Sequence, residues 1–199
     1  MSAPYLMAYT LKTAPTFEPV ATDTLMEHIR FTPSDDRLLL QRFVSAARQW
    51  VEAYTGRSLA TQTWQASMPS LTSPIWLPMA APLASVTHVK YYDTDNVQQT
   101  WASSNYLTPA FHEPAMMEWS ATATLPSVYD RSDAVQLEYV AGYAQDECPE
   151  SLQMAVLMLA AHFFENREAV LVSAISKEVE FAVTALAAPY RVWVSGWQA

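Results

Sequence analysis

The sequence predicts an α+β fold: a helical core of about four helices, with a β-rich antiparallel insertion between the second and third long helical segments. Three observations predict it. Apolar residues follow the period of a helix from about residue 34 to 55. That period disappears between 60 and 142, where prolines and aromatic residues become frequent. A strongly apolar helical pattern then returns from 149 to 168, which places the β-rich part inside a helical frame.

The N-terminal part predicts an extended segment followed by a short helix. Residues 1–20 are interrupted by prolines and look extended. A helix is predicted over about Asp23–Arg30, because Thr24 and Glu27 have the spacing of a capping box.

A second, longer helix is predicted from residues 34–36, whose serine and aspartates suit a helix N-terminus, to about Thr55. Charged residues such as Arg48 and Glu52 fall mostly off its apolar stripe. Gly56 fits the left-handed residue that ends many helices. The stripe consists of Leu40, Phe43, Val44, Ala47, Val51 and Tyr54.

Six short strands are predicted in the region that follows. Residues 86–92 alternate in the two-residue period of a strand, and the Asp-Thr-Asp-Asn stretch at 93–96 predicts a hairpin turn. The strand candidates are 61–67, 75–79, 86–92, 97–101, 115–119 and 135–140. We interpret the region as a small, mostly antiparallel β-domain.

The long helix predicted over 149–168 is the most apolar segment. Pro149 and Glu150 suit its first turn. Residues 154–161 contain no polar side chain for more than two turns, so the helix must be covered on several sides, by its own domain or by neighbouring subunits. The apolar run is too short to cross a bilayer, and no membrane partner is expected. A last helix is predicted over about 180–188, ended by Pro189.

These elements predict three parts of the chain. Residues 1–59 form an N-terminal extension and the first part of the helical core. Residues 60–144 form the β-rich insertion, and residues 145–199 form the second part of the helical core with a C-terminal tail.

Composition excludes several classes of function. The formal charge of −9 argues against a protein that wraps nucleic acid, which needs a basic surface. With only three glycines the chain has no glycine-rich phosphate loop, dinucleotide fingerprint or G-x-S-x-G elbow. One cysteine, Cys148, allows no internal disulfide, and the first residues lack a signal-peptide pattern, so we expect a cytosolic origin.

Several segments together resemble one family. They are VEAYTGRSL (51–59), PLASVTHVKYYDTD (82–95), VQLEYVAGYA (135–144), PESLQMAVLMLAAHFFENREAV (149–170) and ALAAPYRVW (185–193). In this order they resemble the head–tail connector, or adaptor, proteins of tailed bacteriophages and phage-derived gene transfer agents. The likeness runs from about Glu18 to Trp193.

The resemblance implies a structural role without catalysis, cofactor or metal. Such adaptors form a dodecameric ring below the portal in the virion neck, after assembly in the bacterial cytoplasm. The portal binds one face, a stopper or other tail-side connector protein binds the other, and double-stranded DNA passes through without specific binding. The net negative charge would suit a conduit along which DNA slides.

Candidate contact residues follow from the resemblance for the portal, and from the long apolar helix with its charged end for the neighbouring subunit. Since the C-terminal part of related adaptors engages the portal, the portal-docking candidates are Tyr190, Arg191, Trp193 and Trp197; aromatic and arginine side chains are the usual energetic centres of interfaces. The inter-subunit candidates on and after the long helix are Leu157, His162, Glu165 and Arg167.

Two alternatives stay open on the sequence. The aromatic residues of the β-rich part could form a β-sandwich module that binds a sugar or protein ligand. An enzyme would depend on His162 with Glu165 as an acid/base pair, or on Cys148, whose place before a helix lowers a thiol pKa in principle. His112 beside Glu113 lacks the spacing of metal ligands, because neighbouring strand residues point to opposite faces.

Overall fold

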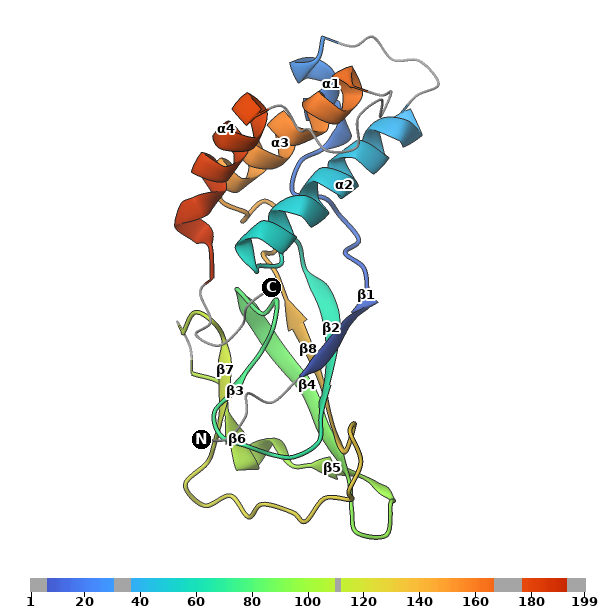
Figure 1. Ribbon diagram of the computed structural model, residues 1–199, viewed down its shortest axis with the longest axis vertical. Helices are drawn as coiled ribbons and strands as arrows, with labels where there is room; N and C mark the ends of the chain where they lie inside the picture. Colours follow the sequence, from blue (N-terminus) through green and yellow to red (C-terminus); the bar gives the residue numbers. More distant parts are fainter. Residues whose placement is uncertain (1–6, 31–36, 110–111, 167–176, 193–199) are drawn as a thin grey trace. The chain divides into compact units, whose positions relative to one another are not determined.

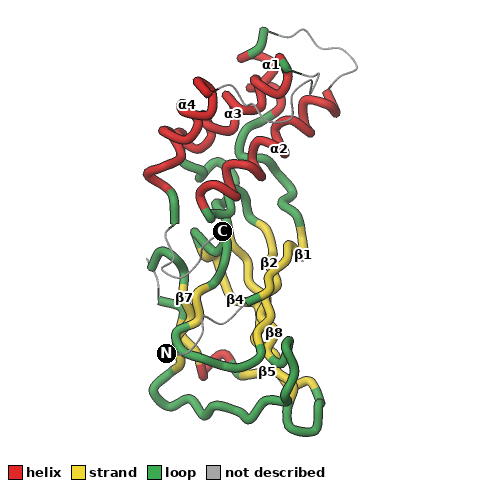
Figure 2. The backbone as a smooth tube through the Cα atoms, viewed as in Figure 1, coloured by secondary structure: helices red, strands yellow, loops and turns green. Residues whose placement is uncertain are grey.

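The computed structural model of the chain describes residues 7–30, 37–109, 112–166 and 177–192 (Figure 1). The chain divides into two compact units. The helical unit comprises Thr16–Ala60 and Tyr143–Arg191, and the β unit comprises Met1–Pro15, Thr61–Gly142 and Val192–Ala199. All α-helices of the described residues belong to the first unit and all strands to the second (Figure 2). The predicted α+β class with a β-rich insertion is confirmed.

Four α-helices are present in the described part of the helical unit: α1 (Thr22–His28), α2 (Arg37–Thr55), α3 (Glu150–Glu165) and α4 (Lys177–Ala187). A 3₁₀ turn, η2 (Ala188–Tyr190), follows α4. α3 packs against both α2 and α4 (Figure 1). The core contains Leu25 and Met26 of α1, Leu40, Val44, Ala47 and Val51 of α2, Leu152, Ala155, Val156, Leu159 and Ala160 of α3, and Val183 and Ala187 of α4.

The observed helix ends agree with only part of the capping predicted from the sequence. Gly56 follows α2 with φ of 69°, in the left-handed region that favours glycine. The capping box predicted at Thr24 and Glu27 is wrong, because α1 begins at Thr22 and its N-cap is Ala21, which makes no side-chain cap. Pro149 is the N-cap residue of α3, with Glu150 in the first turn as expected.

The β unit contains two antiparallel sheets around one apolar core. The larger sheet has the strand order β1-β2-β8-β4-β5, built from β1 (Ala8–Thr13), β2 (Gln62–Met68), β8 (Val135–Ala141), β4 (Leu83–Tyr92) and β5 (Gln98–Trp101). The smaller sheet has the order β3-β7-β6, built from β3 (Ile75–Trp76), β7 (Met116–Trp119) and β6 (Tyr106–Leu107). A short 3₁₀ turn, η1 (Ser103–Asn105), precedes β6.

Two strands were not predicted. β6 is only two residues long. β1 falls in the segment expected to be merely extended, and it pairs with β2 from Ala8 opposite Ser67 to Leu11 opposite Trp64. This pairing joins the N-terminal residues to the β unit, whereas the sequence placed them with the helical core.

The hairpin turn after β4 has the expected chemistry. The Asp93 carboxylate accepts hydrogen bonds from the backbone N–H groups of Asp95 (3.1 Å) and Val97 (2.9 Å). Asn96 adopts φ of 59°, which asparagine tolerates better than most residues. The hydrogen bond from Gln99 and these backbone donors hold the pKa of Asp93 below its ordinary value.

The larger sheet has one apolar and one polar face. Tyr139 of β8 is fully buried on the apolar face, and its hydroxyl donates a hydrogen bond of 2.6 Å to the Pro78 carbonyl oxygen. On the other face two rows of polar side chains cross the strands in register. One row is Thr10, Gln65, Glu138 and His88; the other is Ser67, Gln136 and Lys90, with Ala8 opposite Ser67 at its β1 end.

Candidate interaction surfaces

The first candidate surface is the end of α4, where two of the predicted docking residues lie. Arg57, the residue after Gly56, is 8% exposed. Its Nε donates a hydrogen bond to the carbonyl oxygen of Tyr190, and its Nη1 donates one of 3.3 Å to the Tyr143 hydroxyl. Its guanidinium also lies 6.0 Å from the centre of the Tyr190 ring. A buried residue at the end of α2 therefore holds the turn that follows α4.

A second contact holds the next residue. The Arg191 guanidinium lies 5.2 Å from the centre of the Tyr54 ring, within the range of a cation–π interaction. Arg57 therefore holds the backbone of Tyr190, and Tyr54 contacts the side chain of Arg191. The side chain of Tyr190 is partly exposed and that of Arg191 is exposed. The other two docking candidates, Trp193 and Trp197, lie outside the described residues.

A buried ion-pair network stabilises the end of α2. Arg48 is 4% exposed and donates to Glu52 (2.6 Å) and to Glu18 (2.7 Å). The second carboxylate oxygen of Glu52 accepts the backbone N–H of Leu59 at 2.8 Å, which ties the loop carrying Arg57 to the helix. The sequence places Arg48 and Glu52 mostly off the apolar stripe of this helix, and the expectation that they are not buried is wrong. Both can be buried because their opposite charges compensate each other.

The inter-subunit candidates of α3 have different environments. Leu157 is 7% exposed and belongs to the helical core. Residues of its own chain therefore bury nearly all of this side chain, for which the sequence also predicts a contact with a neighbouring subunit. His162 is partly exposed and Glu165 is exposed. The Asn166 side chain, at the C-cap of α3, bonds to the His162 ring at 3.2 Å and to its carbonyl oxygen at 3.0 Å. Arg167 lies outside the described residues.

The catalytic candidates are not brought into a catalytic arrangement. In the described residues, His162 bonds to Asn166 and no hydrogen bond or ion pair joins it to Glu165. Cys148 is buried, and burial, with a further effect from the Glu52 charge, raises the pKa of its thiol to about 12. The lowering expected from the helix N-terminus is therefore outweighed by desolvation. His112 bonds to the Pro114 carbonyl oxygen at 2.9 Å.

No group of three His, Cys, Asp or Glu side chains in the described ranges is placed to hold a metal ion. Likewise, none of the described helices is long and apolar enough to cross a membrane.

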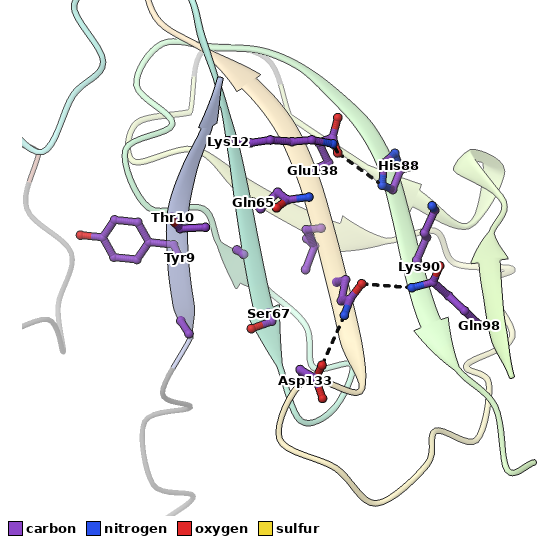
Figure 3. A pocket seen from close by; sticks show the side chains of 14 residues that line it. Tyr9, Thr10, Lys12, Gln65, Ser67, His88, Lys90, Gln98, Asp133 and Glu138 are labelled. Carbon is purple, nitrogen blue, oxygen red and sulfur yellow. Dashed lines mark hydrogen bonds and ion pairs between the residues drawn. The ribbon is translucent and has the colours of Figure 1, made fainter. Parts of the chain in front are cut away.

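The polar face of the larger sheet forms an open groove of about 410 Å³ (Figure 3). At one end of it (Figure 3) the Glu138 carboxylate forms an ion pair with the Lys12 ammonium, and His88 Nε2 lies 3.7 Å from the same carboxylate oxygen. The hydrogen bond from Lys12 lowers the pKa of Glu138. Lys12 reaches Glu138 across β2 from the position of the β-bulge in β1, where the register shifts between Leu11 and Thr13.

This groove differs from an aromatic ligand site. Its side chains pair with one another: Gln98 donates to Gln136 at 3.1 Å, and Gln136 lies 3.4 Å from Asp133 (Figure 3). The aromatic residues of the β unit, which motivated the binding-module alternative, include Trp64, Trp101 and Tyr106, and these are buried in its core. The hydrogen bond between Gln98 and Gln136 connects β5 and β8 of the larger sheet.

The chain is similar in fold to solved structures, although it matches no known sequence family. No protein-family profile matches the chain, and no curated protein matches it in sequence. Among solved structures, the chain is similar to one from the neck of an empty GTA particle computed with C6 symmetry (20% identity, TM-score 0.75, covering 94% of this chain and 96% of that one).

Two further structures are similar. One is a chain in the virion of a native gene transfer agent (GTA) particle, with 21% identity, a TM-score of 0.76, and coverage of 94% of this chain and 96% of that one. The other is in the neck of a native GTA particle computed with C12 symmetry, with 22% identity, a TM-score of 0.66, and coverage of 92% and 97%. The fold is shared over nearly the whole length of each chain.

Proposed function

We propose that this chain is a structural, non-catalytic head–tail adaptor that forms a ring in the neck of a phage-like particle. The observation that carries the proposal is the match over 94% of this chain and 96% of a chain from a GTA particle neck, with a TM-score of 0.75. The match covers both units of this chain, and the role is carried over from that neck chain by analogy of fold.

The ring contains twelve copies in this proposal. A particle neck computed with C12 symmetry supports that number, and C6 symmetry is compatible with it because six divides twelve. A cyclic ring needs two different patches on each copy, one meeting the other on the next copy.

One face of the ring binds the portal through the C-terminal segment. The contacts of Arg57 with the Tyr190 backbone and of Tyr54 with the Arg191 side chain support this part, because residues that are already held in place lose less entropy when they dock. The two tryptophans at 193 and 197 follow the anchored residues in sequence. A stopper or other tail-side connector binds the opposite face.

Double-stranded DNA passes through the ring without specific binding. The formal charge of −9 supports passage over retention, since an acidic protein repels phosphate. Assembly takes place in the bacterial cytoplasm, and the finished ring lies in the virion neck.

The test is electron microscopy of the full-length protein mixed with the portal protein of the same particle. We expect a twelve-membered ring seated on one face of the portal. A chain shortened after Val192 keeps the Arg57 anchor and should lose portal binding. If the full-length protein forms no ring, alone or on the portal, the proposed function is wrong; if the shortened chain binds normally, only the docking role of the tail is wrong.

A further inference from the structure

Two large apolar side chains of the helical unit are conspicuously exposed. Phe181 of α4 is 75% exposed and Leu38 of α2 is 71% exposed, the highest values among the large apolar side chains of the described residues. Burying these two exposed apolar side chains against a partner surface would be favourable, because it removes apolar area from water.

On α4, Phe181 belongs to an outward face. Val183, fully buried in the core, lies on the opposite side of the helix, whereas Glu178, Phe181 and Ala185 follow the i, i+3, i+7 spacing of one face and are all exposed. We call these three residues the acidic α4 face. In the described residues, the Glu178 carboxylate forms no ion pair.

On α2, Leu38 belongs to a face with the opposite charge. Leu38 and Arg42 are four residues apart, both exposed, on the side of the helix away from buried Leu40 and Val44. Gln41 is exposed beside them. We call Leu38, Gln41 and Arg42 the basic α2 face. Within the described ranges, the Arg42 guanidinium has no ion-pair partner.

The two faces are different patches on different helices that pack on the same α3 (Figure 1). Each combines one prominent apolar side chain with one unpaired charge, and the charges have opposite sign. Complementary patches of this kind suit a head-to-tail contact between copies, which is the type that closes a ring.

We infer that the acidic α4 face of one copy packs against the basic α2 face of the next copy, with Phe181 against Leu38 and Glu178 paired with Arg42. This inference rests on the proposed ring and identifies its seam. The occupant of each face is therefore a second copy of this chain, with the two apolar side chains supplying burial and the ion pair setting the register.

Charge reversal tests the inference. Arg42→Glu makes both faces negative, and Glu178→Arg makes both positive, so each variant alone should assemble at least about tenfold more weakly, because like charges are brought together. A 1:1 mixture of the two variants should recover, since every contact then joins unlike charges, and so should a chain that carries both substitutions. Ring formation is measured by analytical ultracentrifugation and by microscopy on the portal.

Cross-linking tests the direction of the contact. A chain with Arg42→Cys and Glu178→Cys should give a ladder of covalent multimers with a short bismaleimide. A mixture of the two single variants should stop at dimers, and neither single variant alone should cross-link. Buried Cys148, with its raised thiol pKa, adds little background.

The outcomes separate this inference from the proposed function. If the unmodified protein forms rings while the reversals assemble normally, or a single cysteine variant cross-links to itself, the seam lies elsewhere and the ring stands. If no ring forms at all, both the ring and its seam are wrong. Assembly on the portal with no ladder between copies would show that these two faces do not meet in the ring, which also overturns the inference.

Discussion

Arg57 and Tyr190 are 133 positions apart in the chain, yet the buried guanidinium of the first donates a hydrogen bond to the carbonyl oxygen of the second. The contact joins the loop that follows α2 to the turn that follows α4. A residue outside the predicted docking set therefore holds one member of that set, Tyr190, by its backbone.

The first prediction concerns this anchor. Arg57→Lys keeps the charge but loses the planar fork that serves Tyr190 and Tyr143 at once, so we expect a loss of about 2 kcal/mol in the free energy of unfolding. Amide exchange at residues 188–192 should become faster and portal affinity should fall. Arg30→Lys, at an exposed arginine, is the matched control and should change neither. Unchanged exchange in Arg57→Lys would contradict the anchoring role.

The second prediction concerns the buried ion pair of α2. Glu52→Ala leaves the buried Arg48 charge with Glu18 as its remaining ion-pair partner among the described residues, and it removes the acceptor of the Leu59 N–H. We expect about 3–5 kcal/mol of destabilisation in urea unfolding. Glu27→Ala, at an exposed glutamate of α1, should cost less than about 0.5 kcal/mol.

A double substitution distinguishes an unpaired charge from a lost packing contact. Arg48→Met together with Glu52→Leu removes both charges and keeps most of the volume, so it should recover much of the loss. Equal instability of the single and double variants would instead assign the effect to packing or to the Leu59 hydrogen bond.

These two sites show what the sequence could and could not predict. Local patterns predicted the α2 stripe, the left-handed Gly56 and the turn at 93–96, since each depends on residues within one or two turns of chain. The burial of Arg48 was missed because one of its partners, Glu18, lies thirty positions away. The role of Arg57 was missed for the same reason.

The β unit gives a parallel case. β1 has a weak pattern of its own and becomes a strand because β2 offers it a partner more than fifty residues later. The capping box failed because α1 begins at Thr22, so Thr24 falls within the helix. Capping spacing alone does not fix a helix boundary.

The third prediction uses the pKa of Glu138. The Lys12 hydrogen bond lowers this pKa below its ordinary value of 4.5, so the ion pair stabilises the fold above that pH and its contribution is lost as pH falls through the folded-state pKa. Lys12→Met should therefore destabilise the protein at pH 7, and the difference from the unmodified protein should shrink below pH 4.5.

Urea unfolding at a series of pH values measures this difference. Lys90→Met is the matched control, because Lys90 lies in the same groove without an ion pair in the described residues. If the difference in the free energy of unfolding between Lys12→Met and the unmodified protein stays constant from pH 7 to pH 3.5, Lys12 stabilises the fold through packing of its methylene chain alone.

The fourth prediction concerns the single thiol. With its pKa raised from 9.0 to about 12, Cys148 has a thiolate fraction at pH 8 on the order of a thousandfold smaller than an ordinary thiol. Alkylation of the folded protein by iodoacetamide should be slower by at least that factor, since the side chain is also buried. Labelling in denaturant should be fast, and rapid labelling of the folded chain would disprove the burial.

The register of the larger sheet has a consequence for how such chains diversify. Gln62, where β2 begins, lies opposite Ala141, where β8 ends, so the polypeptide enters and leaves the insertion through two neighbouring strands. The inserted residues between these two points form the β unit together with β1. A change of length at the 93–96 turn, far along the insertion from Gln62 and Ala141, therefore leaves in register the two ends through which the insertion joins the helical unit.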